Sequence, residues 1–481
     1  MVNKCKDKIK ECRVIIDQIE DRLSSLPDEL RIQILSRLPL RSAIVTECLS
    51  SRWRGLWTNI TSVNIEPAGT THPKYSDEFL NALDKIRSRM VSPFIYRFSF
   101  ELINGVQGTF RPPYLDSWVQ QICDRDVREL KLTETRQFPS FIFRTQSLVS
   151  IELRSTSTWV LPDDCEPINL PNLKNLGINL CPAICDWVEK QIKLCPSLEQ
   201  LSLMCETYYW DSPGKRITCS NQNLRRLSIN FKSSKVSHNV VIDAPKLEYL
   251  AIRALKTSTF SFTNEPVVLR EAKIEIYGTT RTPAKPDKLN RVISKFYEDI
   301  SNVRFLGLHI DSLDNNLSTF FRNTTKLTLD MDSSHSISMV LSMLELCPAL
   351  DDLTLKFLHI GDDREWCRHP KLGQSTSKAR RPLKTINIEC YWPKNYDSHP
   401  GLSFLALIEY FLTHATDLER FKVNLDATRL SENVIVKHDE SVELELCKLL
   451  YQCPTMSKRC EVEFVGRCFM MSRKAGPKAK T

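Results

Sequence analysis

Residues 185–203 read CDWVEKQIKLCPSLEQLSL, and this stretch holds the pattern that decides the fold. In its first half, apolar residues recur near the helical spacing until Pro196, which cannot continue a helix. The second half places leucines at positions 198, 201 and 203. Leu201 and Leu203 are separated by a single residue, as in a strand that buries one face. The stretch therefore predicts a helix followed by a short strand.

The strand phrase of this stretch recurs along most of the chain. It consists of an apolar residue, any two residues, a second apolar residue, any one residue and a third apolar residue. Successive copies start about 21 to 35 residues apart, whereas a leucine-rich repeat takes about 20–29 residues. The array should therefore be irregular and carry insertions. Clear copies start at Val127, Leu148, Leu173, Leu198, Leu224, Leu247, Val303, Leu350, Leu383 and Leu418, weaker ones at Leu269 and Thr324, and early ones at Ile60 and Ile95.

Stacking of such units explains the repetition. One unit cannot bury its apolar side alone, but neighbouring units share a continuous core along a parallel sheet. We therefore expect an α/β chain with an irregular leucine-rich-repeat solenoid over residues 61–400. Leu201 and Leu227 should point inward. Gln200 and Ser228, which flank them, should tolerate substitution.

Strand residues between the buried positions should face outward on the concave side of the solenoid. We expect a target to bind there and at the loops 277–290 and 361–382. The outward residues are polar and have no single charge sign, which suits a protein, or a protein joined through a small molecule, better than a phosphate backbone. The candidate target-binding residues are Glu152, Ser202, Ser228 and Thr354.

The ends of the predicted helices point to a family. Cys-Pro pairs at 195–196 and 347–348 come shortly before strand phrases. In this they resemble the irregular repeats of plant F-box proteins, in which a helix ending in Leu-x-x-Cys-Pro precedes a Leu-x-x-Leu-x-Leu strand. The Asn or Cys that follows the strand in regular repeats is mostly absent here, with Cys181 as an exception. The resemblance implies a solenoid of this kind with an uneven arc.

Residues 21–60 contain three short helix-like pieces, the first of which starts at Pro27 and ends at Pro39. Pieces this short bury little surface, so some of their apolar side chains should remain for another protein. The segment closely resembles an F-box, although Ser51 stands where that family commonly has Lys. The matching residues are Leu26-Pro27-Asp28-Glu29-Leu30, Ile34-Leu35, Leu38-Pro39, Ala43, Leu49-Ser50, Arg52-Trp53-Arg54 and Leu56-Trp57.

The F-box resemblance implies a partner. In that family the F-box docks onto a Skp-type adaptor, which links to a cullin scaffold and so to ubiquitin transfer. We expect Pro27, Leu35 and Trp53 to be exposed in the isolated chain and buried in the complex. A free three-helix cap on the repeats is the alternative for this segment. The residues expected to contact the adaptor are Leu26, Pro27, Leu30, Ile34, Leu35, Leu38, Pro39, Leu49, Trp53 and Trp57.

The C-terminal stretch 401–470 resembles the FBD segment found after the repeats in many plant F-box proteins. It predicts helices at 402–413 and 443–451, a strand phrase at Leu418 and a last strand from Cys460 to Val465. An open parallel sheet needs such a unit to cover its last edge. We therefore expect this FBD-like segment to close the solenoid.

Charge and composition exclude several classes. The net charge is +8, of which residues 1–13 supply +3 and residues 472–481 supply +4. A nearly neutral body argues against nucleic-acid binding, because proteins that bind nucleic acids concentrate basic residues on a folded face. We expect basic segments at 1–20 and 471–481, no secretory signal and no membrane span. The 17 cysteines suit reduced, buried thiols, so we expect the nucleus or the cytoplasm and no secretion.

Catalytic patterns are missing from the sequence. It contains no Gly-rich phosphate loop and no Ser elbow, and its carboxylates are scattered. Cys367 and His369 alone do not make a zinc site. We expect neither an enzyme nor a cofactor or metal, but the substrate-recognition subunit of a Skp–cullin–F-box ubiquitin ligase. A repeat scaffold that binds proteins without a ligase role is the alternative, and an enzyme on a repeat scaffold is the third hypothesis.

Overall fold

A computed structural model describes residues 22–65, 77–101, 115–133, 138–155, 169–180, 184–205, 216–231, 237–255, 257–277, 287–309, 319–331, 337–357, 383–390, 402–425, 440–466 and 469–474. They form two compact units, one up to Thr207 and one from Tyr208 onward, and each unit is described by itself. The predicted basic segment 1–20, the loop 361–382 and most of the loop 277–290 lie outside the described residues.

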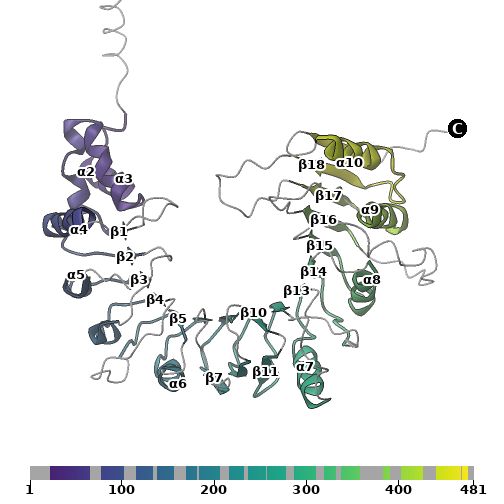
Figure 1. Cartoon of the computed structure of the whole chain (residues 1–481), viewed down its shortest axis with the longest axis horizontal. Coiled ribbons are helices and arrows are strands. Elements are labelled where there is room, and N and C mark those ends of the chain that lie inside the picture. Colours follow the sequence, from purple (N-terminus) through teal and green to yellow (C-terminus); the bar gives the residue numbers. More distant parts are fainter. Residues whose placement is uncertain are drawn as a thin grey trace, which may run out of the picture. The chain divides into compact units, whose positions relative to one another are not determined.

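The F-box segment (residues 21–60) opens the first unit with two α-helices. α2 spans Asp28–Leu35 and α3 spans Leu40–Val45. Pro27 and Pro39 stand directly before them with extended backbone, which is compatible with the fixed φ of proline and starts each helix cleanly. Figure 1 shows both helices beside the first strand of this unit.

The third helix-like piece is broken into three 3-10 turns. Ser50 is extended and Gly55 is left-handed, with φ of 71°, and both residues interrupt a regular helix. The chain therefore curls around itself instead of forming one straight third helix. The turns are η1 (Thr46–Cys48), η2 (Ser51–Trp53) and η3 (Leu56–Asn59).

Replacement of Gly55 by alanine should destabilise the F-box segment through the backbone alone. A Cβ atom at this position would meet no atom within 4 Å, so no clash is expected. The left-handed conformation itself costs an L-residue about 1 kcal/mol or more. Urea unfolding followed by tryptophan fluorescence should show a loss of about 1 kcal/mol. Ser51→Ala, at an exposed position nearby, is the control, and an equal stability of the two variants would contradict this backbone geometry.

Six parallel strands form the sheet of the first unit, and they pair in chain order. α4 (Asp77–Arg89), α5 (Leu115–Cys123) and α6 (Cys185–Leu194) lie along the same side of this sheet (Figure 1). A 3-10 turn, η4 (Ser140–Arg144), lies in the connection from the third strand to the fourth. The strands are β1 (Ser62–Ile65), β2 (Arg97–Phe100), β3 (Glu129–Thr133), β4 (Ser150–Arg154), β5 (Asn175–Asn179) and β6 (Gln200–Met204).

The second unit contains a longer sheet of the same kind. Its strands run parallel in chain order up to β18, and α7 (Asp287–Asp299), α8 (Ile337–Leu346), α9 (Leu402–His414) and α10 (Glu440–Gln452) connect some of them. The strands are β8 (Arg226–Asn230), β10 (Tyr249–Leu255), β12 (Glu271–Tyr277), β13 (Phe305–His309), β14 (Lys326–Met331), β15 (Asp352–Phe357), β16 (Thr385–Cys390), β17 (Arg420–Asn424), β18 (Glu461–Val465) and β19 (Met470–Lys474).

The alternating burial of these strands confirms the predicted inward orientation. Leu201 in β6 and Leu227 in β8 are buried, whereas Gln200 and Ser228 beside them are exposed and half-buried, respectively. The α/β class and the parallel repeat sheet are likewise confirmed. Because register places Leu176 beside Leu201 and Leu250 beside Leu227, each leucine extends the row begun by its neighbour.

A second sheet in this unit was not predicted. β7 (Arg216–Ser220), β9 (Asn239–Asp243) and β11 (Thr259–Phe262) pair in parallel. They occupy intervals that carry helices elsewhere in the repeats. The three stretches are rich in β-branched and aromatic residues, which favours strands over a helix.

The end of the chain closes the long sheet as expected. α9 and α10 occur where helices were predicted, and β18 follows Cys460. β19 then turns back and pairs antiparallel with β18, so it covers an edge that the parallel strands would leave open. The segment expected as a basic tail from 471 thus begins inside this strand. Within the described part of the chain, every helix is too short or too polar to cross a bilayer.

Candidate functional site

Two buried tryptophans organise the interior of the F-box segment. Trp53 is 3% exposed, and its indole Nε1 donates a hydrogen bond to Ser24 Oγ at 2.9 Å. The buried Arg31 guanidinium lies 5.7 Å from the Trp53 ring centroid. It also pairs with Asp28 and donates to the backbone carbonyl of Arg52, so it is bonded despite its burial.

The other tryptophan is held by a carboxylate. Trp57 Nε1 donates to Glu47 Oε1 at 2.7 Å, and the backbone N–H of Gly55 donates to the same oxygen at 2.9 Å. These two bonds, first that of Gly55 and then that of Trp57, hold the pKa of Glu47 below its usual value. The anchored carboxylate fixes η3 against η1.

The expected exposure of Leu35 and Trp53 is wrong. Leu35 is fully buried, and Trp53 and Trp57 are buried with it. A segment this small needs its largest side chains for its own core, so these three residues are core residues in this structure and not surface contacts. Pro27 is exposed, as predicted.

The other predicted adaptor residues remain accessible. Leu30 is 44% exposed, Ile34 is 38% exposed and Leu49 is 59% exposed. Leu26, Leu38 and Pro39 are half-buried. Single exposed apolar residues are ordinary, but several within one short segment suit a docking surface. Their contact with an adaptor stays a prediction.

Sequence reasoning missed two further exposed apolar residues of this segment. Val45 ends α3 and Leu23 precedes α2, and each is 59% exposed. Val45 stands four positions before Leu49, a spacing that could have pointed to a shared side of the segment. We call Leu23, Leu30, Ile34, Val45 and Leu49 the exposed apolar set.

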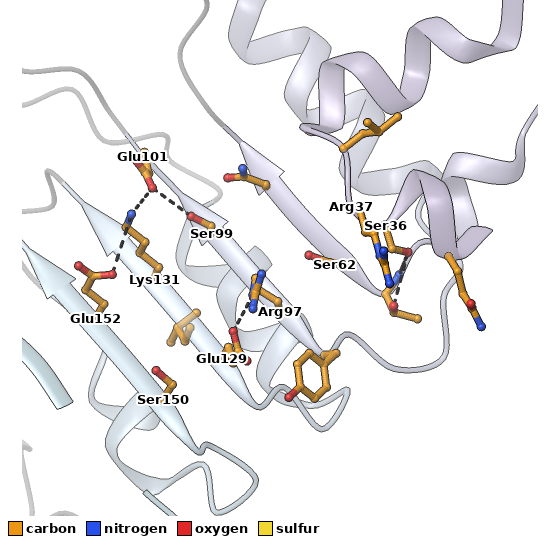
Figure 2. A pocket seen from close by; sticks show the side chains of 16 residues that line it. Ser36, Arg37, Ser62, Arg97, Ser99, Glu101, Glu129, Lys131, Ser150 and Glu152 are labelled. Carbon is orange, nitrogen blue, oxygen red and sulfur yellow. Dashed lines mark hydrogen bonds and ion pairs between the residues drawn. The ribbon is translucent and has the colours of Figure 1, made fainter. Parts of the chain in front are cut away.

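A polar cleft of about 820 Å³ lies beside the F-box segment, within the first unit. One wall comes from the end of α2 and the turn after it, through Gln33, Ser36, Arg37 and Leu38. The floor comes from the outward side chains of β1 to β4, as Figure 2 shows. The cleft therefore joins the F-box segment to the first repeats.

Two rows of strand residues build this floor. The parallel register aligns Ser62, Arg97, Glu129 and Ser150 in the first row. It aligns Asn64, Ser99, Lys131 and Glu152 in the second row. Both rows use the outward positions between buried strand residues, so repeat geometry alone places one polar side chain per strand in each row.

Most charges of the floor are paired with one another. Arg97 Nε donates to Glu129 Oε2 at 2.6 Å, and this bond raises the pKa of the guanidinium. Lys131 pairs with Glu101 and lies 3.9 Å from Glu152. The dashed contacts in Figure 2 follow these pairs across β2, β3 and β4. The floor is thus close to electrically neutral.

The predicted target-binding residues are divided between the two units. Glu152 lines the cleft, and Ser202 continues its row after Gly177 without lining the cleft. A Cβ atom on Gly177 would come 3.3 Å from Cγ of Glu152, so the glycine leaves room for that side chain. Ser228 and Thr354 occupy outward strand positions of the second unit. Target binding at these four residues stays a prediction.

The second unit carries outward aromatic residues that the sequence reasoning missed. Tyr249 lies beneath the Arg226 guanidinium, with 4.0 Å between its ring centroid and Cζ. Phe305 is 39% exposed and has Lys326 Nζ 5.5 Å from its ring centroid. Both aromatic residues stand one position before the first buried residue of their strand, where a large outward side chain could have been noticed.

Metal and thiol chemistry find little support in the described part of the chain. Among those residues, no three His, Cys, Asp or Glu side chains gather as metal ligands would. Cys367 and His369 lie outside the described residues. Burial raises the pKa of Cys123 and Cys195 to about 11 each, so these thiols stay protonated at neutral pH.

Comparison with known proteins agrees with the geometry. Residues 23–62 match the F-box domain, and residues 115–355, about half of the chain, match the family described as FBD-associated F-box protein At5g56370, LRR repeats. Proteins with an F-box and leucine-rich repeats are generally adaptors rather than enzymes, and F-box domains generally bind a Skp-type adaptor within Skp–cullin–F-box ubiquitin ligases.

Relatives from Arabidopsis thaliana match over nearly the whole chain. The chain is 27% identical to F-box/FBD/LRR-repeat protein At5g22660, with 93% of the chain and 97% of the relative covered. It is 26% identical to F-box/LRR-repeat protein 13, over 94% and 99%. It is also 26% identical to FBD-associated F-box protein At1g66310, over 95% and 99%. The chain therefore belongs to the family of plant F-box proteins with FBD-associated leucine-rich repeats.

Proposed function

We propose that this chain is the substrate-recognition subunit of a Skp–cullin–F-box ubiquitin ligase, acting in the nucleus or the cytoplasm. The exposed apolar set would bury itself against the Skp-type adaptor, which connects to a cullin scaffold. The repeats would hold a target protein for ubiquitination and degradation. The chain itself would transfer nothing and would act by raising the effective concentration of the target near the transfer machinery.

The observation that carries this proposal is the exposed apolar set on a segment with an intact core. Trp53, Trp57 and Leu35 already fill that core, so Leu30 and Leu49 are not needed to complete it. A cap that served only the repeats would turn its apolar side chains toward the first strand. Exposed leucines therefore favour a second protein over a free cap.

A second observation concerns the joint between the F-box segment and the repeats. η3 ends at Asn59 and β1 begins at Ser62. Ser36 Oγ accepts a hydrogen bond from the Thr61 N–H at 3.1 Å and donates one to the Ile32 carbonyl at 2.8 Å. The joint between η3 and β1 is two residues long and is hydrogen-bonded to the end of α2, so an adaptor bound to the segment would stand at a fixed position relative to the first repeats.

Complex formation with purified components tests the proposal. The full chain and a plant Skp-type adaptor should form a stable complex that co-elutes in size-exclusion chromatography. Addition of the cullin scaffold should then shift the complex to a larger size. A chain that stays folded and elutes alone would favour the alternative, a repeat scaffold without a ligase role.

A further inference from the structure

Of the residues predicted to contact the adaptor, only Leu38 lines the polar cleft beside α2. The exposed residues Leu30 and Ile34 lie on α2 itself, whereas the cleft begins at the end of that helix and extends over four strands. We propose that the cleft binds an extended segment of the target protein and that Arg37 pairs with an acidic side chain of that segment. That this segment belongs to a ubiquitination target rests on the proposed function, whereas binding of an acidic peptide by the cleft does not depend on it.

The lining of the cleft fits a polypeptide better than a small apolar ligand. Leu38 and Leu130 are its only aliphatic lining residues and Tyr96 is its only aromatic one, and Leu130 is almost fully buried. Small-molecule sites are mostly lined by apolar and aromatic side chains. The hydroxyls of Ser62, Ser99 and Ser150 can instead donate to and accept from peptide groups.

The spacing of the strands suits an extended chain. Neighbouring strands lie about 4.8 Å apart, so the floor from β1 to β4 spans about 14 Å. An extended peptide advances about 3.4 Å per residue, so about four residues cross the floor. Ser62, Ser99 and Ser150 come from β1, β2 and β4, so polar partners recur along that path.

Charge selects the kind of residue that the segment would carry. Arg97 and Lys131 are already paired with Glu129 and Glu101. Arg37 is exposed, and among the described residues its guanidinium has no hydrogen-bond or ion-pair partner. Figure 2 shows its side chain beside the start of β1, near Ser62. A single unpaired guanidinium in a polar cleft matches one carboxylate, which it can bind with two parallel hydrogen bonds.

The small number of unpaired cations in the lining argues against nucleic acid in this cleft. A phosphate backbone gains affinity from several cations, each of which displaces a counterion. Here two of the three cations of the lining are neutralised by neighbouring carboxylates. The carboxylates of Glu101, Glu129 and Glu152 would also repel successive phosphates.

A charge exchange at Arg37 tests this inference. The probe is a displayed library of random ten-residue peptides, selected on the purified full chain with and without bound adaptor. The wild-type chain should enrich peptides with Asp or Glu at one position among polar residues. Arg37→Glu should enrich Lys or Arg at that position. Arg41→Glu, an exposed residue of α3 that does not line the cleft, should keep the acidic preference.

Measured peptide affinities then show how much Arg37 contributes to binding. A synthetic peptide from the wild-type selection should bind Arg37→Glu about tenfold or more weakly, as loss of a charge-assisted hydrogen bond implies. Its Glu→Lys counterpart should bind Arg37→Glu better than the wild type. No enrichment, an acidic preference that survives Arg37→Glu, or an Arg37-dependent preference for a single-stranded oligonucleotide over the peptide would each overturn the inference.

Adaptor binding is measured in the same preparations. If the adaptor fails to bind while the peptide preference follows Arg37, the proposed function fails and the cleft assignment stands. If the adaptor binds and the peptide preference does not follow Arg37, the cleft assignment fails alone.

Discussion

Replacement of Leu30 and Leu49 together by glutamate should abolish stable binding of a Skp-type adaptor while the chain stays folded. The two side chains are 44% and 59% exposed, so the free protein loses little packing when they change. Apolar anchors at the centre of an interface contribute about 2 kcal/mol or more each. Loss of both corresponds to about 4 kcal/mol, or about a thousandfold in dissociation constant. Isothermal titration calorimetry with purified adaptor measures this change.

Val91→Glu is the matched control for this experiment. Val91 is 64% exposed in the same unit but lies outside the F-box segment. Its substitution should leave adaptor affinity unchanged, and circular dichroism should show native spectra for all variants. Unchanged affinity of the Leu30/Leu49 double variant would place the adaptor contact elsewhere, and the exposed apolar set would lose its assigned role.

The repeat architecture could be predicted from the sequence because its signal is local and redundant. The apolar positions of each strand phrase predict which residues are buried, and neighbouring copies give the same prediction. The structure buries the second and third apolar positions at Leu201 and Leu203, and again at Leu227 and Ile229. Periodicity of this kind needs no knowledge of distant contacts.

The interior of the F-box segment could not be predicted in the same way. Pattern matching identifies Leu35, Trp53 and Trp57 as family positions but does not say which side of a short helix they occupy. Their burial depends on contacts between distant residues, such as the bond from Trp53 Nε1 to Ser24 Oγ. Those contacts exist only after the 3-10 turns have folded back on α2.

The polar cleft was beyond sequence reasoning for a related reason. The repeat phrase predicts Glu152 as an outward strand residue, and this residue does line the cleft. Arg37 stands in a turn after a helix and belongs to no repeat phrase, so the sequence pattern does not mark it. Arg37 lies beside Ser62 because the joint between η3 and β1 is short and Ser36 Oγ accepts a hydrogen bond from the Thr61 N–H there. A contact that depends on how the F-box segment joins the first strand leaves no periodic pattern in the sequence.

Truncation of one buried repeat leucine in either unit should destabilise the protein strongly. Leu201→Ala and Leu227→Ala each remove a side chain that is 2% exposed or less and leave a cavity beside a neighbouring leucine. Such substitutions cost about 2–5 kcal/mol. The variants should unfold at clearly lower urea concentration, and proteolysis should show which unit opens first. The loss of stability should be largest near the truncated leucine, because repeats are stabilised mainly by their direct neighbours.

Gln200→Ala and Ser228→Ala supply controls one position away on the same strands. Their side chains point outward, so each should change the free energy of unfolding by about 0.5 kcal/mol or less. The comparison within one strand removes differences in local backbone, since each pair shares β6 or β8. Equal losses at the buried and the outward positions would contradict alternating strands. A loss confined to Leu201 and Leu227 would show that the core leucines stabilise the sheet, while the outward side chains remain free to vary with the target.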